Sequence, residues 1–349
     1  MLEEKDNIFM RRALQLARRG LGNVSPNPMV GAVIVSKSGR IIGEGYHRRF
    51  GDVHAEVNAI NSIRAEDRAL LPESTLYVTL EPCSHFGKTP PCSNLLIENK
   101  LRRVVIATLD PFVKVNGRGA GILRNAGIEV ESGVLEHEAR SLNARFFIAH
   151  TLHRPFIFLK WAQSREGYFS VRYKDIEAPA NERCSAQARF SDNIGLTLMH
   201  RLRANHDAIA VGSGTALADQ PQLTVREWHG RNPQKIIFDR RGRIGSPTPE
   251  IREFLDILYN EGYTSIMVEG GASVLKWFID AGLWDLARIE VCPTRNIRPV
   301  NGVADLWDTP VIAPTISRIP DKTVSTGTNS IYYYYNNIYV NDYFIENAL

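Results

Sequence analysis

Residues 75–92 read TLYVTLEPCSHFGKTPPC, and this stretch indicates how the first part of the chain folds. Its first third, up to Leu80, is rich in β-branched and aromatic residues, as is typical of a buried strand. Cys83 follows the end of that strand, and Cys92 opens the segment CSNLLIENK, which has the apolar spacing of a helix. The pattern therefore places two thiols at a strand end and a helix start, each directly after a proline, with a polar loop between them.

A second motif lies upstream, where residues 54–56 read His-Ala-Glu at the start of a predicted helix. One imidazole and two thiolates suit tetrahedral zinc with one position open for water. We therefore predict that His54, Cys83 and Cys92 bind one Zn²⁺, and that Glu56 moves protons between the water and a departing amine. H-x-E followed by two cysteines is the arrangement of zinc deaminases that act on nucleobases.

Other interpretations of these residues stay open. The tripeptide HAE alone is common at a helix start, and two cysteines at this distance can be ordinary buried thiols. A structural zinc site would need a fourth protein ligand, for which His85 is the obvious local candidate. A non-catalytic zinc domain that binds RNA or another protein is a further hypothesis, although Glu56 and the balanced charge argue against it.

Composition limits the class of protein. The chain has 349 residues, which is long for one hydrophobic core, so two domains are expected. The apolar fraction of 44% and the net charge of +4 are typical of a soluble protein and do not favour nucleic acid as a partner. No apolar run is long enough for a membrane span, and the N-terminus lacks the apolar core of a secretory signal. Four cysteines are too few for a disulfide scaffold, so we predict a cytoplasmic protein.

The order of predicted elements indicates an α/β fold. Helical and strand patterns alternate from residue 8 to residue 132, which is typical of a three-layer α/β/α sandwich. The composition changes between residues 149 and 155, and a second α/β pattern follows. We therefore predict one domain over residues 1–149 and another over 150–349. The run Tyr332 to Tyr335 is expected to be an edge strand.

The loop between the cysteines departs from the P-C-x-x-C of simple deaminases, because eight residues, SHFGKTPP, separate Cys83 from Cys92. This loop resembles one family, the bifunctional deaminase/reductase of riboflavin biosynthesis. The segments SPNPMVGAVIV, GEGYH, HAEVNAI and LDPFVKVNGRGAGILRNAGIEVESGV agree with it, so the resemblance covers nearly all of residues 8–150. It implies a cytidine-deaminase-like first domain.

The resemblance also implies a substrate. The family removes ammonia from a diaminopyrimidinone that carries a phosphoribosylamino group. Lys88, with Ser84 and His85, would then grip the ribose phosphate. Asn27 would hydrogen-bond the pyrimidine, since a carboxamide offers both donors and an acceptor.

The second domain contains VGSGTALADQPQLTVR at 211–226 and VEGG at 268–271, which resemble the reductase half of the same family. That half has a dihydrofolate-reductase-like α/β fold, and the resemblance implies that NADPH reduces the ribose to a ribityl chain. By motif, the cofactor would contact Ala162, Thr215, Asp219 and Gly271. The substrate would contact Arg203, Leu223, Arg226 and Glu269, with the Arg203 guanidinium suited to its phosphate.

Some positions depart from the family pattern. Residues 164–167 read SREG and residues 189–191 read RFS, and the stretch between Asp239 and Glu269 is short. Arg240 lies where its charge can favour a 2′-phosphate, although a solvated turn arginine explains it equally well. The alternative hypothesis is therefore a deaminase whose second domain serves only assembly. The family implies a homo-oligomer formed through that domain.

Overall fold

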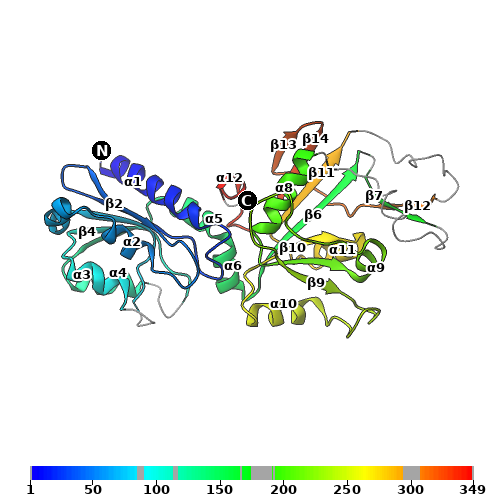
Figure 1. Ribbon diagram of the computed structural model, residues 1–349, viewed down its shortest axis with the longest axis horizontal. Coiled ribbons are helices and arrows are strands. Elements are labelled where there is room, and N and C mark those ends of the chain that lie inside the picture. Colours follow the sequence, from blue (N-terminus) through cyan, green and yellow to red (C-terminus); the bar gives the residue numbers. More distant parts are fainter. Residues whose placement is uncertain are drawn as a thin grey trace. The chain divides into compact units, whose positions relative to one another are not determined.

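The fold is described by a computed structural model over residues 2–84, 90–112, 117–165, 167–173, 191, 193–293 and 307–347. The chain forms two compact units (Figure 1). The first comprises Met1–His153 and Asn341–Leu349, and the second comprises Arg154–Val340. This division by contacts does not test which activity belongs to which range. The assignment of deamination to residues 1–149 and of reduction to residues 150–349 stays a prediction. Of the helices in the described ranges, none has the length and apolar character that a membrane span requires.

Within the described residues, the first unit contains a five-stranded sheet in the order β2-β1-β3-β4-β5. Its strands are β1 (Gly31–Val35), β2 (Ile41–Tyr46), β3 (Thr75–Leu80), β4 (Arg103–Thr108) and β5 (Glu129–Ser132). β1 is antiparallel to β2 and β3, whereas β3, β4 and β5 are parallel. Its helices are α1 (Leu2–Ala17), α2 (Ala55–Asn61), α3 (Cys92–Glu98), α4 (Arg118–Asn125), α5 (Glu136–Leu142), α6 (Ala144–Leu152) and α12 (Asp342–Asn347).

Helices cover both faces of this sheet, so the predicted three-layer arrangement is confirmed. On one face, alternate strand residues pack with α2, α3 and α4 in a buried core that includes Ala32, Ile34, Leu76, Val78, Val104, Ile106, Ala59, Leu96 and Leu123. On the other face α1 crosses β1 so closely that a Cβ at Gly31 would lie 2.0 Å from the carbonyl oxygen of Ala13. Only glycine fits at this crossing.

A buried ion pair ties α1 to the sheet. Arg103 on β4 donates two hydrogen bonds, of 2.9 and 2.8 Å, to the carboxylate of Asp6 on α1. The Tyr77 hydroxyl on β3 donates a third to Asp6 at 2.7 Å. Burial pushes the pKa of Asp6 up, but the hydrogen bonds from Arg103 and Tyr77 outweigh it and hold the pKa below its ordinary value.

The C-terminal helix α12 packs in the first unit. Phe344 is fully buried, and the Arg145 guanidinium lies 5.3 Å from the centre of its ring. The Ser141 hydroxyl at the end of α5 donates a 2.7 Å hydrogen bond to Asn341. The first unit is therefore made from two separate stretches of the chain.

The second unit contains, within the described residues, a seven-stranded sheet in the order β13-β14-β11-β6-β10-β8-β9. Its strands are β6 (Phe156–Ser164), β8 (Ala208–Gly212), β9 (Gln234–Phe238), β10 (Ser265–Gly270), β11 (Leu286–Cys292), β13 (Lys322–Thr326) and β14 (Asn329–Tyr335). A separate pair is formed by β7 (Tyr168–Tyr173) and β12 (Trp307–Ile312). The helices are α8 (Asn193–Ala204), α9 (Ser213–Asp219), α10 (Ile251–Asn260) and α11 (Ala272–Asp280).

The central strands β11, β6, β10, β8 and β9 run parallel, which places their carboxyl ends along one edge. In open α/β sheets this edge is where ligands bind. The predicted edge position of Tyr332–Tyr335 is wrong, because β14 lies between β11 and β13. Gly327 and Thr328 connect β13 to β14 as a tight hairpin. The sequence of β13 is polar, so its pattern did not predict a strand.

Candidate active sites

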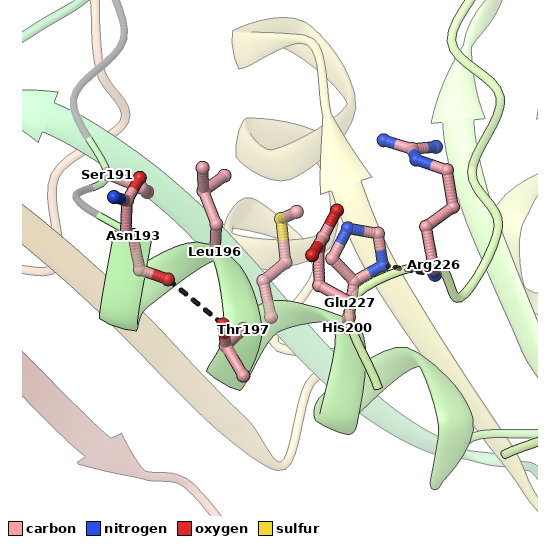
Figure 2. A pocket seen from close by; sticks show the side chains of 8 residues that line it. Ser191, Asn193, Leu196, Thr197, His200, Arg226 and Glu227 are labelled. Atoms are coloured by element: carbon pink, nitrogen blue, oxygen red, sulfur yellow. Dashed lines mark hydrogen bonds between the residues drawn. The ribbon is translucent and has the colours of Figure 1, made fainter. Parts of the chain in front are cut away.

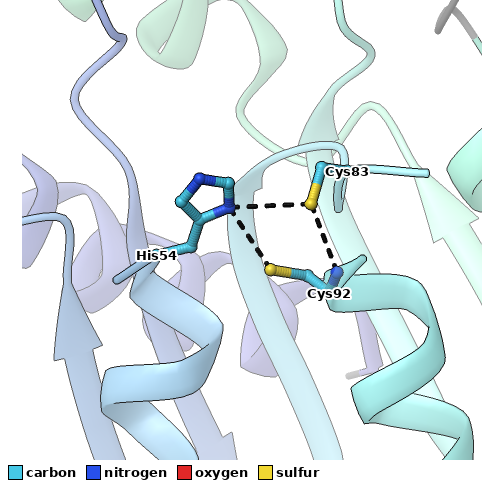
Figure 3. A group of neighbouring side chains, drawn as sticks. All are labelled: His54, Cys83 and Cys92. Atoms are coloured by element: carbon cyan, nitrogen blue, oxygen red, sulfur yellow. Dashed lines mark hydrogen bonds between the residues drawn. The ribbon is translucent and has the colours of Figure 1, made fainter. Parts of the chain in front are cut away.

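Three predicted metal ligands meet in the first unit (Figure 3). His54 is the residue before the first turn of α2, Cys83 follows β3, and Cys92 is the first residue of α3. The Nδ1 atom of His54 lies 3.6 Å from Sγ of Cys83 and 3.4 Å from Sγ of Cys92. Within the described residues, their three ligand atoms lie within 4.8 Å of one another.

The contacts within the cluster shift the pKa values of its two thiols in opposite directions. Hydrogen bonds with the Cys92 thiol, His54 and the Cys92 backbone lower the pKa of Cys83 to about 4 in spite of its burial. The same contact with Cys83, together with burial, raises the pKa of Cys92. Cys92 is buried and His54 is exposed, so the cluster opens toward solvent at His54. One nitrogen and two sulfur donors with one open side fit Zn²⁺ in a three-ligand site. The fourth-ligand candidate His85 lies outside the described residues.

Glu56 lies in the first turn of α2, beside the cluster. It is only 3% exposed, and burial raises the pKa of its carboxyl group to about 7, although the charge of His54 opposes the shift. Within the described residues, the converging ligand atoms are those of His54, Cys83 and Cys92, without Glu56. This arrangement leaves the carboxyl group available for proton transfer.

Asn27 contacts a residue that the sequence analysis did not single out. Its amide nitrogen lies 3.2 Å from Nε2 of His47, whose ring stands edge-on to that of His54 at 5.8 Å. Nδ1 of His47 lies 3.2 Å from the carbonyl oxygen of Val53, which can only accept, so Nδ1 carries the proton. Nε2 therefore accepts from the Asn27 amide, which orients the Asn27 oxygen. The motif GEGYH contained this signal, but no role was assigned to its histidine.

Glu81 supports the segment that carries Cys83. Its buried carboxylate accepts hydrogen bonds from the backbone N–H groups of Gly117 and Ala120, both at 3.0 Å, and of Asp110 at 3.2 Å. A Cβ at Gly119 would lie 2.1 Å from the carbonyl oxygen of Pro82, so α4 abuts the chain just before Cys83. The start of α4 and the end of β3 are thereby locked together. Lys88, predicted to bind phosphate, lies outside the described residues.

In the second unit, the predicted cofactor residues lie at the carboxyl edge of the parallel strands. Ala162 lies near the end of β6, Thr215 in α9 after β8, and Gly271 after β10. Thr215 and Gly271 are neighbours, because a Cβ at Gly271 would be 3.3 Å from the Thr215 hydroxyl oxygen. Gly271 also has a φ of +75°, which favours glycine. Asp219 is the last residue of α9.

Two predicted substrate residues form a buried ion pair. Arg203 on α8 donates to both carboxylate oxygens of Glu269 on β10, at 2.7 and 2.6 Å. Its remaining Nη donates to the carbonyl oxygen of Thr224 at 3.0 Å. Burial pushes the pKa of Glu269 up, but Arg203 outweighs it and lowers the pKa. The predicted contact of Arg203 with a phosphate stays a prediction, since its guanidinium is held by these partners here.

Leu223 and Arg226 lie in the segment that follows α9. Leu223 is buried against Ile209 and Val211 of β8 and has a φ of +53°. Arg226 is exposed, and its backbone N–H donates to Nδ1 of His200 at 3.1 Å. Both Arg226 and His200 line a pocket of about 700 Å³, together with Ser191, Asn193, Leu196, Thr197, Met199 and Glu227 (Figure 2).

Two further side chains of the second unit were not predicted. Lys160 on β6 is buried with its Nζ 3.6 Å from the sulfur of Met199, and burial lowers its pKa although Glu269 opposes the shift. Its position within the apolar strand sequence FIFLKWA was the available signal.

Arg243 donates a 2.6 Å hydrogen bond to the Ser213 hydroxyl at the start of α9. Arg240, by contrast, lies over the ring of Trp277 at 5.2 Å.

Comparisons with known proteins agree with this architecture. The family model described as the cytidine and deoxycytidylate deaminase zinc-binding region matches residues 3–108, and the RibD C-terminal domain matches residues 155–295. The riboflavin biosynthesis protein RibD of Escherichia coli is 33% identical to this chain over an alignment of 362 positions. The alignment covers 88% of this chain and 94% of that protein. RibD of Bacillus amyloliquefaciens is 35% identical, covering 80% and 82%. RibD of Aquifex aeolicus is 43% identical, but the match covers 63% of that relative's length.

A solved structure extends the comparison to the whole fold. The diaminohydroxyphosphoribosylaminopyrimidine deaminase/5-amino-6-(5-phosphoribosylamino)uracil reductase of Thermotoga maritima has a TM-score of 0.78 at 34% identity, covering 95% of this chain and 99% of that one. The fold and its sites define a two-unit protein that joins a zinc-deaminase fold to a dihydrofolate-reductase-like fold. The chain belongs to the RibD family of riboflavin biosynthesis proteins.

Proposed function

We propose that the first unit hydrolytically deaminates a diaminopyrimidinone bearing a phosphoribosylamino group, and that the second unit reduces the ribose of the product to a ribityl chain with NADPH. The convergence of His54, Cys83 and Cys92 beside the buried Glu56 is the observation that carries the proposal. The family to which the chain belongs supports the choice of substrate.

In the first unit, His54, Cys83 and Cys92 would hold Zn²⁺. The bound ion would supply a water whose pKa is lowered toward neutrality. Glu56 takes a proton from the attacking water and gives one to the departing amine, so that ammonia leaves as a neutral molecule. Its carboxyl group is beside the cluster and shielded from bulk water, which suits a group that must both accept and donate.

Substrate recognition in the first unit is assigned to Asn27 and Lys88. Asn27 presents its amide oxygen to a donor on the pyrimidine, because donation of one N–H to His47 fixes the orientation of the carboxamide. Lys88 contributes a positive charge for the ribose phosphate, as the resemblance to the family implies.

In the second unit, NADPH would supply hydride to the open-chain ribose. Thr215 and Gly271 offer a hydroxyl and an unobstructed backbone at the edge of the sheet for the dinucleotide, with Ala162 and Asp219 at the same edge. Arg226 is exposed at a pocket and is suited to the substrate phosphate. Leu223, Arg203 and Glu269 are the other proposed substrate residues, and the ion pair with Arg203 fixes the Glu269 carboxylate.

The experiment is to give the protein the phosphoribosyl diaminopyrimidine and to follow ammonia release and NADPH oxidation separately. Both signals are expected, with ammonia release first. Ammonia without NADPH oxidation would favour the alternative, a deaminase whose second domain serves assembly. Neither signal from zinc-loaded protein would overturn both assignments.

Assembly and location are further parts of the proposal. We expect copies to associate through residues 150–349, as the family resemblance implies, and the mass of the particle in solution tests this. A cytoplasmic location is consistent with the small number of cysteines, four in 349 residues.

A further inference from the structure

The side chain of His200 contacts the backbone of Arg226, a predicted substrate residue. It lies in α8, is 2% exposed, and its Nδ1 accepts the backbone N–H of Arg226 at 3.1 Å (Figure 2). An imidazole nitrogen that accepts carries no proton, so the proton of the neutral ring is on Nε2. The ring is kept neutral, because burial and the charges of Arg203 and Arg226 lower its pKa, against opposing effects of the Thr224 carbonyl and Glu227.

The segment that contains Arg226 depends on such side-chain contacts. Residues 224–226 do not belong to a helix or strand, so no backbone ladder holds them. Instead, the Thr224 carbonyl accepts from Arg203, the Val225 N–H donates to Asn232, and the Arg226 N–H donates to His200. Arg203 and His200 lie one turn apart on α8. One helix face therefore fixes both ends of this short segment.

The guanidinium of Arg226 is held only loosely by contrast. Its Nη1 contacts the Gln222 side chain at 3.0 Å and the Thr224 hydroxyl at 3.2 Å, and the residue is exposed. With so few side-chain contacts, the reach of this guanidinium toward a ligand is limited by the position of the Arg226 backbone. A displacement of that backbone by an ångström would move the charge away from a bound phosphate.

We propose that His200 is a positioning residue for the reductase substrate: by accepting the Arg226 N–H, it fixes Arg226 so that the guanidinium reaches the phosphate. This inference rests on the proposed reductase function. In the segment HRLRANHDAIAVG, two residues three positions apart would then serve the substrate site. Arg203 pairs with Glu269, and His200 positions Arg226.

Two variants test the inference. H200L removes the acceptor, whereas H200N keeps one, because the Asn Oδ1 takes a position close to that of Nδ1. We expect H200L to raise the KM for the deaminated, phosphorylated substrate about tenfold. The same substrate without its phosphate should show little change, and H200N should recover most of the loss. NADPH affinity, measured by its fluorescence, reports whether the second unit of each variant is folded.

Each outcome has a clear meaning. If H200L leaves the KM unchanged, if both variants lose affinity equally, or if both substrates are affected alike, the inference is overturned. Loss of NADPH binding in both variants would show that His200 is needed only for folding, which also overturns it. If the wild-type protein oxidises no NADPH, the proposed function fails and this inference fails with it.

Discussion

The two sites hold their reactive side chains in different ways. In the first unit, one nitrogen and two sulfur atoms of His54, Cys83 and Cys92 converge on one point, a donor set that suits a metal ion. In the second unit, Arg203 and Glu269 satisfy each other. The first site therefore offers its donors to an ion, whereas the charged pair of the second is held by contacts within the protein. The predictions below test this difference, beginning with the largest expected effect.

Replacing Cys83 by serine should abolish zinc binding, because the hard hydroxyl is a poor substitute for a thiolate ligand. The zinc content of dialysed protein should fall from one per chain to near zero, and ammonia release should fall to background. Cys292→Ser is the matched control, since Cys292 lies outside the cluster, and its zinc content should be unaltered. NADPH oxidation with substrate that is already deaminated should survive in Cys83→Ser. Full zinc content in that variant would contradict the site.

Replacing Glu56 by glutamine should leave zinc in place and slow ammonia release by about 10²–10⁴-fold, because the amide cannot transfer the proton. The measurement is steady-state ammonia release at saturating substrate. Glu98→Gln, an exposed carboxylate in the first unit, should behave as wild type. Activity that survives Glu56→Gln would show that another group carries the proton.

Replacing Glu269 by glutamine should destabilise the second unit by about 3–5 kcal/mol, because Arg203 would stay buried without its carboxylate. Denaturant unfolding followed by NADPH fluorescence measures this. Asp280→Asn is the matched control. It removes the exposed partner of Lys276, an i,i+4 pair of the kind that contributes about 0.3–0.5 kcal/mol. Equal effects of the two changes would mean that the Arg203 pair is not buried in solution.

The same pair predicts an acid dependence. Since the pKa of Glu269 lies below its ordinary value of 4.5, its ionised form stabilises the folded state above about pH 4.5. That contribution is lost as the pH falls through the lower folded pKa. The unfolding midpoint of the second unit should therefore drop on acidification, and Glu269→Gln should flatten the profile. An identical profile in the variant would assign the acid sensitivity to other carboxylates.

The smallest effect is expected for Tyr77→Phe, which removes one of three hydrogen bonds to Asp6 while Arg103 keeps the carboxylate paired. The loss should be about 1 kcal/mol in the stability of the first unit. Thermal unfolding measures it, and zinc content should not change. A loss as large as that of Glu269→Gln would show that Tyr77 does more than donate this bond.

The sequence predicted the first unit well because its signals are local. The strand at Thr75–Leu80 and the helices that begin at Ala55 and Cys92 follow from apolar spacing, and the motif residues lie at their ends. The convergence of three ligands then follows from the packing of α2 and α3 on the same face of the sheet, beside the end of β3. His47 was not assigned a role, because its value comes from the Asn27 contact, which no spacing reveals.

The second unit was predicted less completely for a physical reason. Whether Arg203 points to a ligand or to Glu269 depends on packing between α8 and β10, which are far apart in sequence. The hairpin partner of Tyr332–Tyr335 was hidden by the polar sequence of β13. The return of α12 was not foreseen either, since its contacts with Ser141 and Arg145 span some two hundred residues.

The packing of α12 in the first unit determines where the chain can be cut to isolate that unit. Cutting the chain after residue 149 would remove Phe344 from the first unit and expose the apolar surface that it covers. Residues 154–340 therefore interrupt the stretch of chain that builds the first unit. A free-standing first unit would therefore need His153 joined by a linker to Asn341. A simple truncation after residue 149 is expected to be less stable than this linked form.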